Sequence, residues 1–578
     1  MKAPPRSRFM PRSLELLDGY GRERLLADIR AGATVGLVAL PLALALGAAS
    51  VPLGARMPFP APAVGIFTAI IAGFIVSALG GSRVQIAGPT AVFLPIIPLI
   101  VERYGFDGLL LATVMAGCIL VAMGLARLGP AIEFIPFPVT SGFTTGIAVS
   151  VIVSQATEFL GIRSDAPAPR EFLERIQWLW SHIPDINPMA AATGMSCLLL
   201  IFVWPRLGLR RVPGPLVAIV FAGLAIALLG GSHADGVATV GTRFGASGAA
   251  MALPPFTIPI ISLARIRGLI APAVTIALLG SIESLLSAAV ADGLANDRHN
   301  PDTELIAQGA ANIVCPFFCG LPSSGAVSRT SANVRSGGTT PVAGMVHAAT
   351  LLVLVLVFSR FAQFVPMAAI AAVLMMVAFR MGEWNELNRL RHMPRADAVV
   401  LVTTFAATVL FDLVVAVEIG MVLAAFLFAR RFVRTTEVTR AAAESEPGAG
   451  QEAAFGDEAL GDVLVYEVSA PFSFGAAEKM EDAVEGAGKL PRVLVLRMQN
   501  VGAADATALN ALESIIDRIR AAGGAVVLSG SKPQLLKTLL RAGLIGKIGR
   551  ANIRAHITDA LLRARELAGR TDRRRGLP

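Results

Sequence analysis

Charged residues are scarce in this sequence. Asp, Glu, Lys and Arg make up only 16% of the 578 residues, whereas soluble domains carry about 25%. Hydrophobic residues make up 54%, and the mean hydropathy is +0.66. This apolar excess is too large for one globular core, so the composition predicts a protein embedded in a lipid bilayer. The charges that are present gather at residues 1–30, in short loops and after Arg430.

Cysteine is also rare, and the motifs of several enzyme classes are missing. The chain has no Gly-x-x-x-x-Gly-Lys-Ser/Thr string and no His/Cys cluster, so we expect no nucleotide-driven pump, no metal or hydrolytic enzyme and no cofactor. His347 lies in an apolar run and is interpreted as a packed or cavity-lining residue. The cysteines lack paired metal spacing and are interpreted as small buried side chains: Cys118, Cys197, Cys315 and Cys319.

Apolar runs dominate the first three quarters of the chain. A spanning helix needs about 20 mostly apolar residues, and the runs predict about fourteen spans. Thr303–Phe318 is mixed, and two runs, Ala91–Val101 and Ala326–Val334, are short and flanked by Gly or Pro. The clear candidates are Ala31–Ala49, Ala63–Leu79, Gly108–Ala126, Val139–Leu160, Ala190–Trp204, Pro213–Leu229, Leu269–Ala291, Pro341–Phe358, Phe364–Phe379, Asp397–Leu410 and Leu413–Phe428.

The arginines predict the orientation of these spans. Short loops rich in Arg face the cytoplasm, and this rule explains the net charge of +9 better than nucleic-acid binding does. It places both termini in the cytoplasm of an inner (plasma) membrane. The basic N-terminus continues into further charged residues before any apolar run, unlike a cleavable signal peptide. The inner loops would hold Arg83, Arg127, Arg206, Arg210, Arg211, Arg380, Arg389, Arg391, Arg395, Arg430, Arg431 and Arg434.

The composition changes after the last apolar run, where Ala441–Gly461 is typical of a linker. Beyond it, apolar strand-like segments alternate with helix-like ones, which predicts a small mixed sheet flanked by helices. The strands expected are Val463–Val468, Arg492–Leu496 and Ala525–Leu528, and the helices are Ala504–Ala521 and Pro533–Ala542. The expected organisation is a cytoplasmic segment 1–30, a transmembrane domain 31–434, a linker 435–460 and an α/β domain 461–570.

A weak internal duplication is the most informative feature. Ile29–Gly32 opens the first span and Ile266–Gly268 opens the eighth, while the interrupted segment Gly88–Thr90 recurs as Gly325–Ser328 at nearly the same offset. Because each half then has an odd number of spans, the two copies must be inverted in the membrane. Matching interrupted segments are the best sequence indication of a transport site.

The interrupted segments have a direct physical consequence. A half-helix that begins inside the membrane leaves its first N–H groups unpaired, and its dipole places partial positive charge there. Two such ends facing each other would bind an anion. The alternative is that the segments are kinks that help packing, which would suffice for one isolated Gly-Pro. For a matched pair at repeat spacing we favour the site.

Two ionisable residues lie in apolar spans, where charge is costly and usually functional. Arg329 begins the second short segment and would add a formal positive charge to the anion site. Glu283 would bind a proton or a cation that couples to transport. The alternative is a structural ion pair between Glu283 and Arg329, and the two roles can coexist.

These residues belong to strings that identify a family. The chain resembles the SulP family of sulfate permeases and related anion carriers over nearly its whole length. Within that family, its sequence strings are most similar to those of the bacterial aerobic dicarboxylate transporters. The C-terminal part resembles a STAS domain. The strings that carry the resemblance are Ala31–Gly36, Gly80–Ala91, Glu283–Leu286, Asn312–Val314 and Ser328–Gly337.

The resemblance implies an all-α polytopic domain built as a 7+7 inverted repeat with core and gate parts, which tends to form a homodimer. It implies that Glu283 occupies the acidic position of the eighth span. Many members carry Gln where this chain has Leu42, which leaves the size of the substrate open. The anion would lie between the third and tenth spans, and therefore between Ala87, Gly88, Pro89, Thr90, Ala91 on one side and Gly325, Ala326, Val327, Ser328, Arg329 on the other.

The STAS-like part carries one candidate regulatory residue. Related anti-sigma antagonists have Asp-Ser-Ser-Gly at a helix start, with a phosphorylated third residue, and Thr507 takes that position in Asp505–Ala508. The alternative is that Asp505 is a plain helix N-cap. A cytoplasmic protein partner would bind through this domain.

Together these features favour a secondary transporter that works by alternating access. The expected substrate is sulfate or a related inorganic anion, with bicarbonate and dicarboxylates as alternatives. Transport would be driven by H⁺ or Na⁺ symport or by anion exchange, since no nucleotide site is present in the sequence. A passive anion channel and a membrane-bound anion sensor are the rival classes.

Overall fold

A computed structural model of the chain shows two compact units, residues 1–424 and 425–578, and each is considered by itself. The sequence placed the end of the membrane domain at residue 434. The structure describes residues 9–16, 20–51, 57–130, 137–164, 168–169, 171–207, 212–228, 236–244, 253–411, 419, 422–423, 438–440, 463–468, 491–501 and 506–575.

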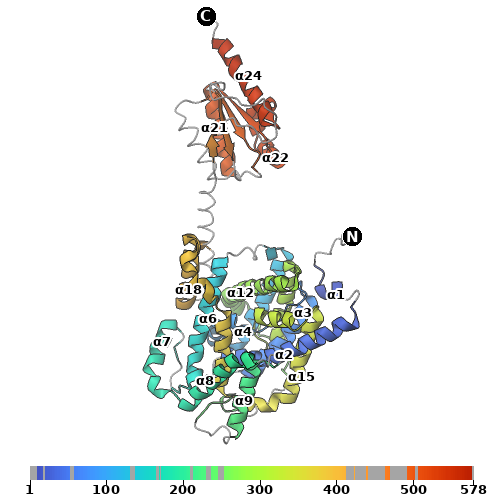
Figure 1. Cartoon of the computed structure of the whole chain (residues 1–578), viewed down its shortest axis with the longest axis vertical. Coiled ribbons are helices and arrows are strands. Elements are labelled where there is room, and N and C mark those ends of the chain that lie inside the picture. The colour runs from blue at the N-terminus through green and yellow to red at the C-terminus, as the bar shows by residue number, and fades with distance from the viewer. Residues whose placement is uncertain are drawn as a thin grey trace. The chain divides into compact units, whose positions relative to one another are not determined.

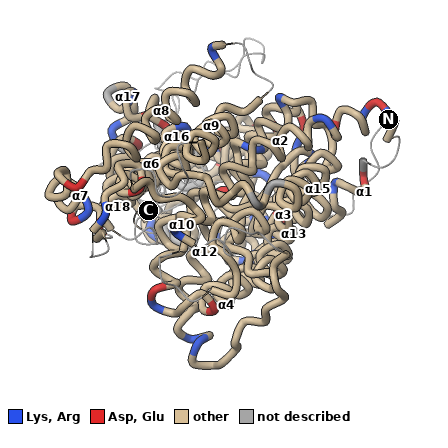
Figure 2. Tube along the Cα trace, turned by 90° about the horizontal axis from the view of Figure 1, so that it is seen from below, with Lys and Arg blue, Asp and Glu red and all other residues tan. Residues whose placement is uncertain are grey.

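Long apolar helices make up the first unit, and α2 lies beside α15 although the two are far apart in sequence (Figure 1). Figure 2 shows how few charged positions interrupt its chain trace. The main helices are α2 Arg22–Ser50, α3 Ala61–Leu79, α4 Ile97–Leu125, α6 Phe137–Leu160, α8 Pro188–Val203, α9 Gly214–Leu228, α12 Leu263–Ala295, α13 Pro301–Val314, α14 Val327–Arg335, α15 Pro341–Phe358, α16 Met367–Met381 and α18 Arg395–Leu410.

Six of the described helices are long and apolar enough to cross a membrane: α2, α3, α4, α6, α8 with the turn that follows it, and α12. Shorter apolar helices accompany them at α9, α15, α16 and α18. The polytopic helical fold predicted from composition is therefore confirmed, while the figure of about fourteen spans stays a prediction. The last expected span, Leu413–Phe428, lies outside the described residues apart from 419 and 422–423.

The helices pack in two groups. One group contains α2, α3, α4, α12, α13 and α15, and the other contains α6, α8, α9, α16 and α18. Helix α16 belongs to the second group but also packs against α2 in the first. We call these the core group and the gate group, because the family resemblance implies parts with those names.

A backbone break inside α4 separates two predicted runs. Gly105 has φ 75° and ψ 172° between the short run that ends at Val101 and the long run that begins at Gly108. No heavy atom lies within 4 Å of a Cβ built at Gly105. Glycine is therefore favoured here by the positive φ and not by a lack of space.

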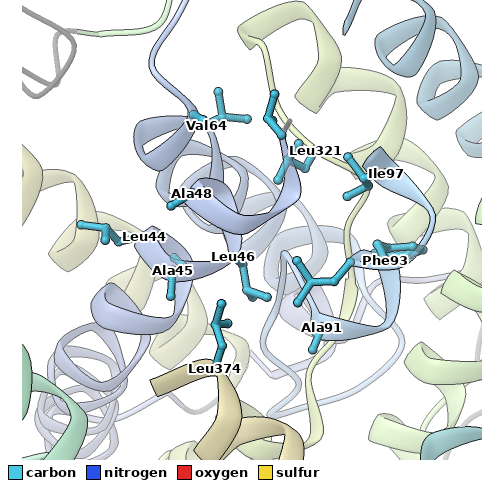
Figure 3. Close-up of a cluster of buried hydrophobic side chains, with 14 of the residues drawn as sticks. Leu44, Ala45, Leu46, Ala48, Val64, Ala91, Phe93, Ile97, Leu321 and Leu374 are labelled. Carbon is cyan, nitrogen blue, oxygen red and sulfur yellow. The ribbon is translucent and has the colours of Figure 1, made fainter. Parts of the chain in front are cut away.

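Close helix crossings depend on small residues, as is usual in membranes. A Cβ on Gly65 of α3 would lie 2.1 Å from the carbonyl oxygen of Ala43 and 2.6 Å from the amide nitrogen of Gly47, both on α2. The α2–α3 pair therefore approaches to backbone contact. Farther along, Leu46 of α2 and Leu374 of α16 gather with the residues around Ala91 in a buried apolar cluster (Figure 3).

Three features of the first unit were not predicted. An amphipathic helix, α7 (Phe172–Ser181), lies in the long loop before α8, and short helices α1 (Arg12–Leu16), α10 (Val240–Phe244) and α17 (Trp384–Asn388) stand outside the predicted spans. Three of the four cysteines are buried as expected, but Cys118 is exposed. It lies on the outward side of α4, where a bilayer would surround a spanning helix, so the expectation of burial was wrong for Cys118.

The second unit is a five-stranded sheet with order β3-β4-β5-β6-β7, in which β3 is antiparallel to β4 and the other neighbours are parallel. Its elements are β3 Val438–Arg440, β4 Val463–Val468, β5 Val493–Arg497, β6 Ala525–Ser529, β7 Ile553–Arg554, α21 Ala506–Ala521, α22 Pro533–Arg541, α23 Leu544–Ile548 and α24 Ile557–Arg575. The predicted α/β domain is confirmed. Residues 438–440, which the sequence assigned to the linker, instead form the edge strand β3.

Alternation along β5 gives the sheet two apolar faces. Leu494 and Leu496 pack in a cluster with α21, α22 and α23, whereas Val493 and Val495 pack with Ala560 of α24 on the other face. Helices thus cover both sides of the sheet. This is the layered arrangement that the alternating strand and helix pattern predicted.

Candidate anion-binding site

The two interrupted segments lie side by side. Strand β1 (Ala87–Gly88) and strand β2 (Ser324–Gly325) form a two-residue antiparallel ladder, in which Ala87 pairs with Gly325 and Gly88 pairs with Ser324. The amide of Ala326 extends the ladder by donating to the carbonyl of Ile86 at 3.0 Å. All ten residues expected to line the anion site therefore lie on two adjoining segments, and the irregular backbone finds partners within the protein.

A helix begins immediately after each strand. Thr90 is the N-cap of a 3₁₀ turn, η1 (Ala91–Phe93), and Ala326 is the N-cap of α14. Neither helix start receives a hydrogen bond from the side chain of its N-cap residue. Helix N-termini without such caps leave N–H groups and partial positive charge available to an anion.

The first segment differs from the predicted half-helix. The α-helix expected over Ala91–Val101 begins only at Ile97, after η1 and a turn. Pro95 lacks the N–H that would continue a helix from the preceding turn, whereas Pro98 lies in the first turn of α4, where no N–H is needed. The dipole of this segment is correspondingly weaker than that of α14.

The two segments also differ in exposure. Ala87 and Ala91 are 0% and 5% exposed, whereas Val327 in the first turn of α14 is 38% exposed and Ser328 is exposed beside it. The β1 side therefore forms a buried wall. The first turn of α14 is the more exposed of the two helix starts.

Glu283 on α12 connects both segments. Its Oε2 accepts hydrogen bonds from the hydroxyl of Thr90, at 2.7 Å, and from the hydroxyl of Ser324. The two hydroxyl oxygens are 2.9 Å apart. The next residue, Ser284, accepts a hydrogen bond from the amide of Gly325 at 2.9 Å. A change in the protonation or ligation of Glu283 would therefore alter its hydrogen bonds to both broken segments at once.

Arg329 is 1% exposed and contacts backbone carbonyls. Its Nη2 donates to the carbonyl of Pro89, and its Nη1 lies 3.5 Å from the carbonyl of Ala87. Among the described residues no carboxylate lies within 4.0 Å of its guanidinium. Glu283 and Arg329 therefore form no direct salt bridge, although their opposite charges attract each other, and Arg329 brings a formal positive charge to the carbonyls of the first segment.

Gly88 leaves space for this arginine. Its φ is +154°, and a Cβ there would lie 2.3 Å from Nη1 of Arg329. Both the backbone angle and the space therefore require glycine. This glycine lies at the point where the guanidinium contacts the first segment.

Two asparagines that belong to the family strings, but were assigned no role from the sequence, complete the site. Asn312 exchanges two hydrogen bonds of 2.9 Å with the backbone of Ser323, and Asn333 donates to the carbonyl of Val84 at 2.9 Å. Asn312 stands out in the sequence as a polar side chain inside an apolar run, whereas Asn333 lies in the polar segment Val327–Arg335 and has no such signal. Such residues satisfy backbone groups that no helix pairs, which buried backbone requires.

The structure describes the side chain of one other predicted residue, His347, but not that of Thr507. His347 is completely buried, and neither ring nitrogen has a hydrogen-bond partner among the described residues, in keeping with a packed residue. Thr507 lies in the first turn of α21. Its side chain and the neighbouring Asp505 lie outside the described residues, so the phosphorylation and capping alternatives both stay predictions.

Comparison with known protein families identifies the family of this chain. The model of the sulfate permease family matches residues 25–404, and that of the STAS domain matches residues 457–560. The chain belongs to the sulfate permease family. Its members are transporters, which agrees with the expectation that the chain is not an enzyme.

Two curated relatives match almost the whole of this chain. The putative sulfate transporter YvdB of Bacillus subtilis is 35% identical and covers 93% of this chain and 97% of its own length. The bicarbonate transporter BicA of Synechocystis is 28% identical and covers 93% of this chain and 94% of its own length.

Solved structures show the same fold. The murine anion transporter Slc26a9 in the inward-facing state superposes with a TM-score of 0.82 at 16% identity, covering 96% of this chain and 94% of its own. The transmembrane domain of a cyanobacterial BicA superposes with a TM-score of 0.60 at 28% identity, covering 70% of this chain and 98% of its own.

Proposed function

We propose that this permease is a secondary active transporter that carries small inorganic anions, sulfate first among them, by alternating access. The observation that carries the proposal is the ladder between β1 and β2, which sets the uncapped start of α14 beside a second helix start inside an apolar bundle. The core group of helices would carry the anion past the gate group.

Electrostatics supports an anion as the substrate. The exposed first turn of α14 offers N–H groups and the positive end of a helix dipole, and Arg329 adds one formal charge behind it. Glu283 is the only nearby carboxylate in the described contacts of the two segments. The charges of Glu283 and Arg329 cancel, so the dipoles of the segments decide the sign of the attraction.

Glu283 is the proposed coupling residue. When it takes up a proton, the net charge of the site rises by one and an anion binds more tightly. By linkage the anion must favour proton uptake to the same extent. A Na⁺ ion bound by Glu283 and by the hydroxyl oxygens of Thr90 and Ser324 would have the same electrostatic effect, because hard cations prefer oxygen ligands.

The substrate class rests on the relatives. A sulfate carrier is proposed because the relative with 35% identity over 93% of the chain is named as a putative sulfate transporter. A bicarbonate carrier is the second candidate, since BicA is named for that anion. Leu42 is half-buried and packs against the apolar cluster, so it offers no hydrogen-bond donor, and dicarboxylates stay a further candidate.

The cellular arrangement follows from the arginine distribution in the loops. The proposal places the chain in the inner (plasma) membrane with the N-terminus and the STAS domain in the cytoplasm. A homodimer and a cytoplasmic protein that binds the STAS domain are the proposed macromolecular partners. Chemical labelling of single cysteines introduced into the loops, from either side of sealed vesicles, would test the orientation.

The decisive experiment measures uptake of labelled sulfate, bicarbonate and succinate into proteoliposomes with imposed H⁺ or Na⁺ gradients. Ser328→Glu places a negative charge in the exposed first turn of α14 and should abolish uptake. Ser336→Glu, at the opposite end of the same helix, should retain it. Equal loss in both variants, or none in either, would contradict the proposed site.

The same vesicles separate a carrier from a channel. A carrier accumulates the labelled anion against its gradient and saturates, with no unitary current in planar bilayers. Single-channel currents would favour the passive anion channel instead. A chain that binds anions but shows neither uptake nor current would favour the sensor.

A further inference from the structure

Helix α7 (Phe172–Ser181) packs against α6 and α18 at the edge of the gate group (Figure 1). Figure 2 shows it at the edge of the same unit in a second view. Leu173, Ile176 and Trp180 follow one another at helical spacing, and they are 59%, 42% and 77% exposed. We call these three side chains the apolar face of α7. So much exposed apolar surface on one side of a helix indicates a binding surface.

Arg175 fixes the opposite side of α7 to α6. Its Nη2 donates to the carbonyl of Ser154 at 2.8 Å and lies 3.3 Å from the hydroxyl of Thr157. Trp178 is half-buried, and its ring stacks on that of His182 with the centroids 4.2 Å apart. These contacts fix the rotation of α7 about its axis, so the apolar face points away from the protein.

The contacts of Arg175 also set the depth of α7 in the membrane. Helix α6 has 24 residues and is therefore about 36 Å long, somewhat more than the roughly 30 Å of a hydrocarbon core. Ser154 precedes the last residue of α6, Leu160, by six positions, which is about 9 Å along the helix. Helix α7 thus lies beside the last turns of α6, where hydrocarbon gives way to headgroups.

The next spanning helix begins at the same level. The amide of Asn187, the N-cap residue of α8, donates to the carbonyl of Leu160 at 3.1 Å. The chain therefore leaves the membrane at the end of α6 and returns to it beside that end. The segment between them, which contains α7, stays close to the membrane surface.

The exposed apolar surface continues from α7 onto α8. Ile183 in the turn after α7 and Met189 in the first turn of α8 are exposed, and Met195 and Leu199 follow them along α8. Because α8 with the turn that follows it is long and apolar enough to cross a membrane, acyl chains surround its exposed side. Tryptophan is enriched at the level of the headgroups, which is the level of Trp180. This continuity identifies lipid as the occupant of the apolar face.

We propose that α7 is an interfacial anchor whose apolar face binds the glycerol and upper acyl region of phospholipids. No headgroup charge is needed, because the face consists of apolar side chains. In the proposed orientation the lipids belong to the outer leaflet. The anchor holds the gate group at a fixed depth while the core group moves, and this consequence rests on the proposed alternating access.

The test measures the depth of Trp180 by fluorescence quenching. A full-length chain that retains only Trp180 is placed in phosphatidylcholine liposomes whose acyl chains carry a nitroxide near the headgroup or near the chain end. Trp180 should lose most of its emission with the upper label and much less with the lower one, because an interfacial side chain reaches only the top of the acyl chains. The tryptophans changed to Phe are Trp178, Trp204 and Trp384.

Trp178 is the matched control, since two positions along a helix place it on the side opposite Trp180. A chain that retains only Trp178 should be quenched less by the upper label. In the otherwise natural chain, Trp180→Phe alone should also reduce the quenching by the upper label, which keeps the test valid if a triple variant does not fold.

Three results would overturn the anchor. The upper label could quench Trp178 as strongly as Trp180. Aqueous iodide could quench Trp180 where the lipid labels do not, which would place the face in water. The emission of Trp180 could follow the dilution of protein in lipid and ignore the labels, which would mean that a second copy covers the face.

Failure of the transport proposal would look different. If Ser328→Glu left uptake unchanged, the quenching of Trp180 would not be affected. A reversed orientation would move the contact to the other leaflet and leave the depth of Trp180 as expected. If Trp180 were exposed to water, the uptake measured in proteoliposomes would stand.

Discussion

The hydroxyl of Thr90 donates a 2.7 Å hydrogen bond to Oε2 of Glu283, although 193 positions separate the two residues in sequence. Ser324, on the other broken segment, donates to the same oxygen. A single carboxylate of α12 therefore holds the two halves of the candidate site together. Its charge bears on the geometry of the site as well as on its electrostatics.

Replacement of Glu283 by Gln should remove proton coupling. The amide oxygen still accepts hydrogen bonds from Thr90 and Ser324, so the two segments should stay together, but the residue no longer titrates. We expect sulfate binding to persist while the stimulation of uptake by an inward H⁺ gradient disappears. Counterflow of labelled sulfate, which is driven by unlabelled sulfate inside the vesicles and needs no H⁺ gradient, should continue.

The gradient dependence of uptake in proteoliposomes measures this effect. Unchanged pH-driven uptake in Glu283→Gln would show that the coupling residue lies elsewhere. Loss of H⁺ dependence with retention of Na⁺ dependence would separate the two coupling ions. If Na⁺ is the coupling ion, the variant should lose its Na⁺ dependence instead.

Glu304 is a second buried glutamate, and its contacts indicate a structural role in contrast to the coupling role proposed for Glu283. It is fully buried on α13, and its Oε2 accepts from the amides of Gly81 at 3.0 Å and Ser82 at 3.2 Å. These contacts fix the loop that leads into β1. Glu304→Ala should lower the stability by roughly 2 kcal/mol, because two buried donors lose their acceptor.

Thermal unfolding in detergent should therefore show a lower apparent Tm for Glu304→Ala than for the wild type. The milder Glu304→Gln should retain the H⁺ dependence of uptake, unlike Glu283→Gln. If the glutamine variants at 283 and 304 changed the coupling alike, the assignment of Glu283 alone would be wrong.

Much of the helical architecture could be predicted from composition, because a run of apolar residues long enough to cross a bilayer leaves few alternatives. The pairing of Ala87 with Gly325 had only an indirect signal, the repeated offset between two Gly-containing segments. Strands of two residues have no periodicity to detect. The unequal exposure of the two segments depends on neighbouring helices, which the local sequence does not specify.

The contacts of Arg329 show most clearly what could not be predicted from the sequence. Its position in an apolar segment predicted a role at the site, but the sequence offered Glu283 as its natural partner. The structure pairs it with the carbonyls of Ala87 and Pro89 instead. Those carbonyls are free because the broken segment forms no helix there, and this follows only from the tertiary fold. Strand β3 was not predicted for a similar reason, because a three-residue edge strand has no sequence pattern that distinguishes it from a linker.

Gly88 should tolerate no side chain. Gly88→Ala combines an unfavourable positive φ with a Cβ placed 2.3 Å from the guanidinium of Arg329, so the arginine must move. We expect sulfate uptake to fall at least about tenfold, the effect of one lost charge-assisted contact. Gly105→Ala is the control, because it also has a positive φ but open space around it.

Initial uptake rates per folded protein compare the two variants. Gly105→Ala should cost only the backbone strain of about 1–2 kcal/mol in stability and should retain uptake. If Gly105→Ala lost uptake as fully as Gly88→Ala, strain alone would account for the effect. The displacement of Arg329 would then have no part in it.

The crossing of α2 and α3 gives the sharpest stability prediction. A methyl group on Gly65 would overlap the carbonyl of Ala43 and the backbone of Gly47, so the two helices must separate. Overpacking of this kind typically costs about 1–3 kcal/mol, and here it acts on backbone atoms that cannot rotate away. Gly65→Ala should therefore lower the apparent Tm and the yield of folded protein.

Gly293→Ala is the matched control, since Gly293 is also helical and has no heavy atom within 4 Å of its Cβ position. This change should be neutral or should raise the stability by up to about 1 kcal/mol, because alanine restricts the unfolded chain more than glycine does. A Gly65→Ala variant as stable as Gly293→Ala would mean that α2 and α3 can move apart without cost. The close approach of their backbones would then contribute little to the stability of the fold.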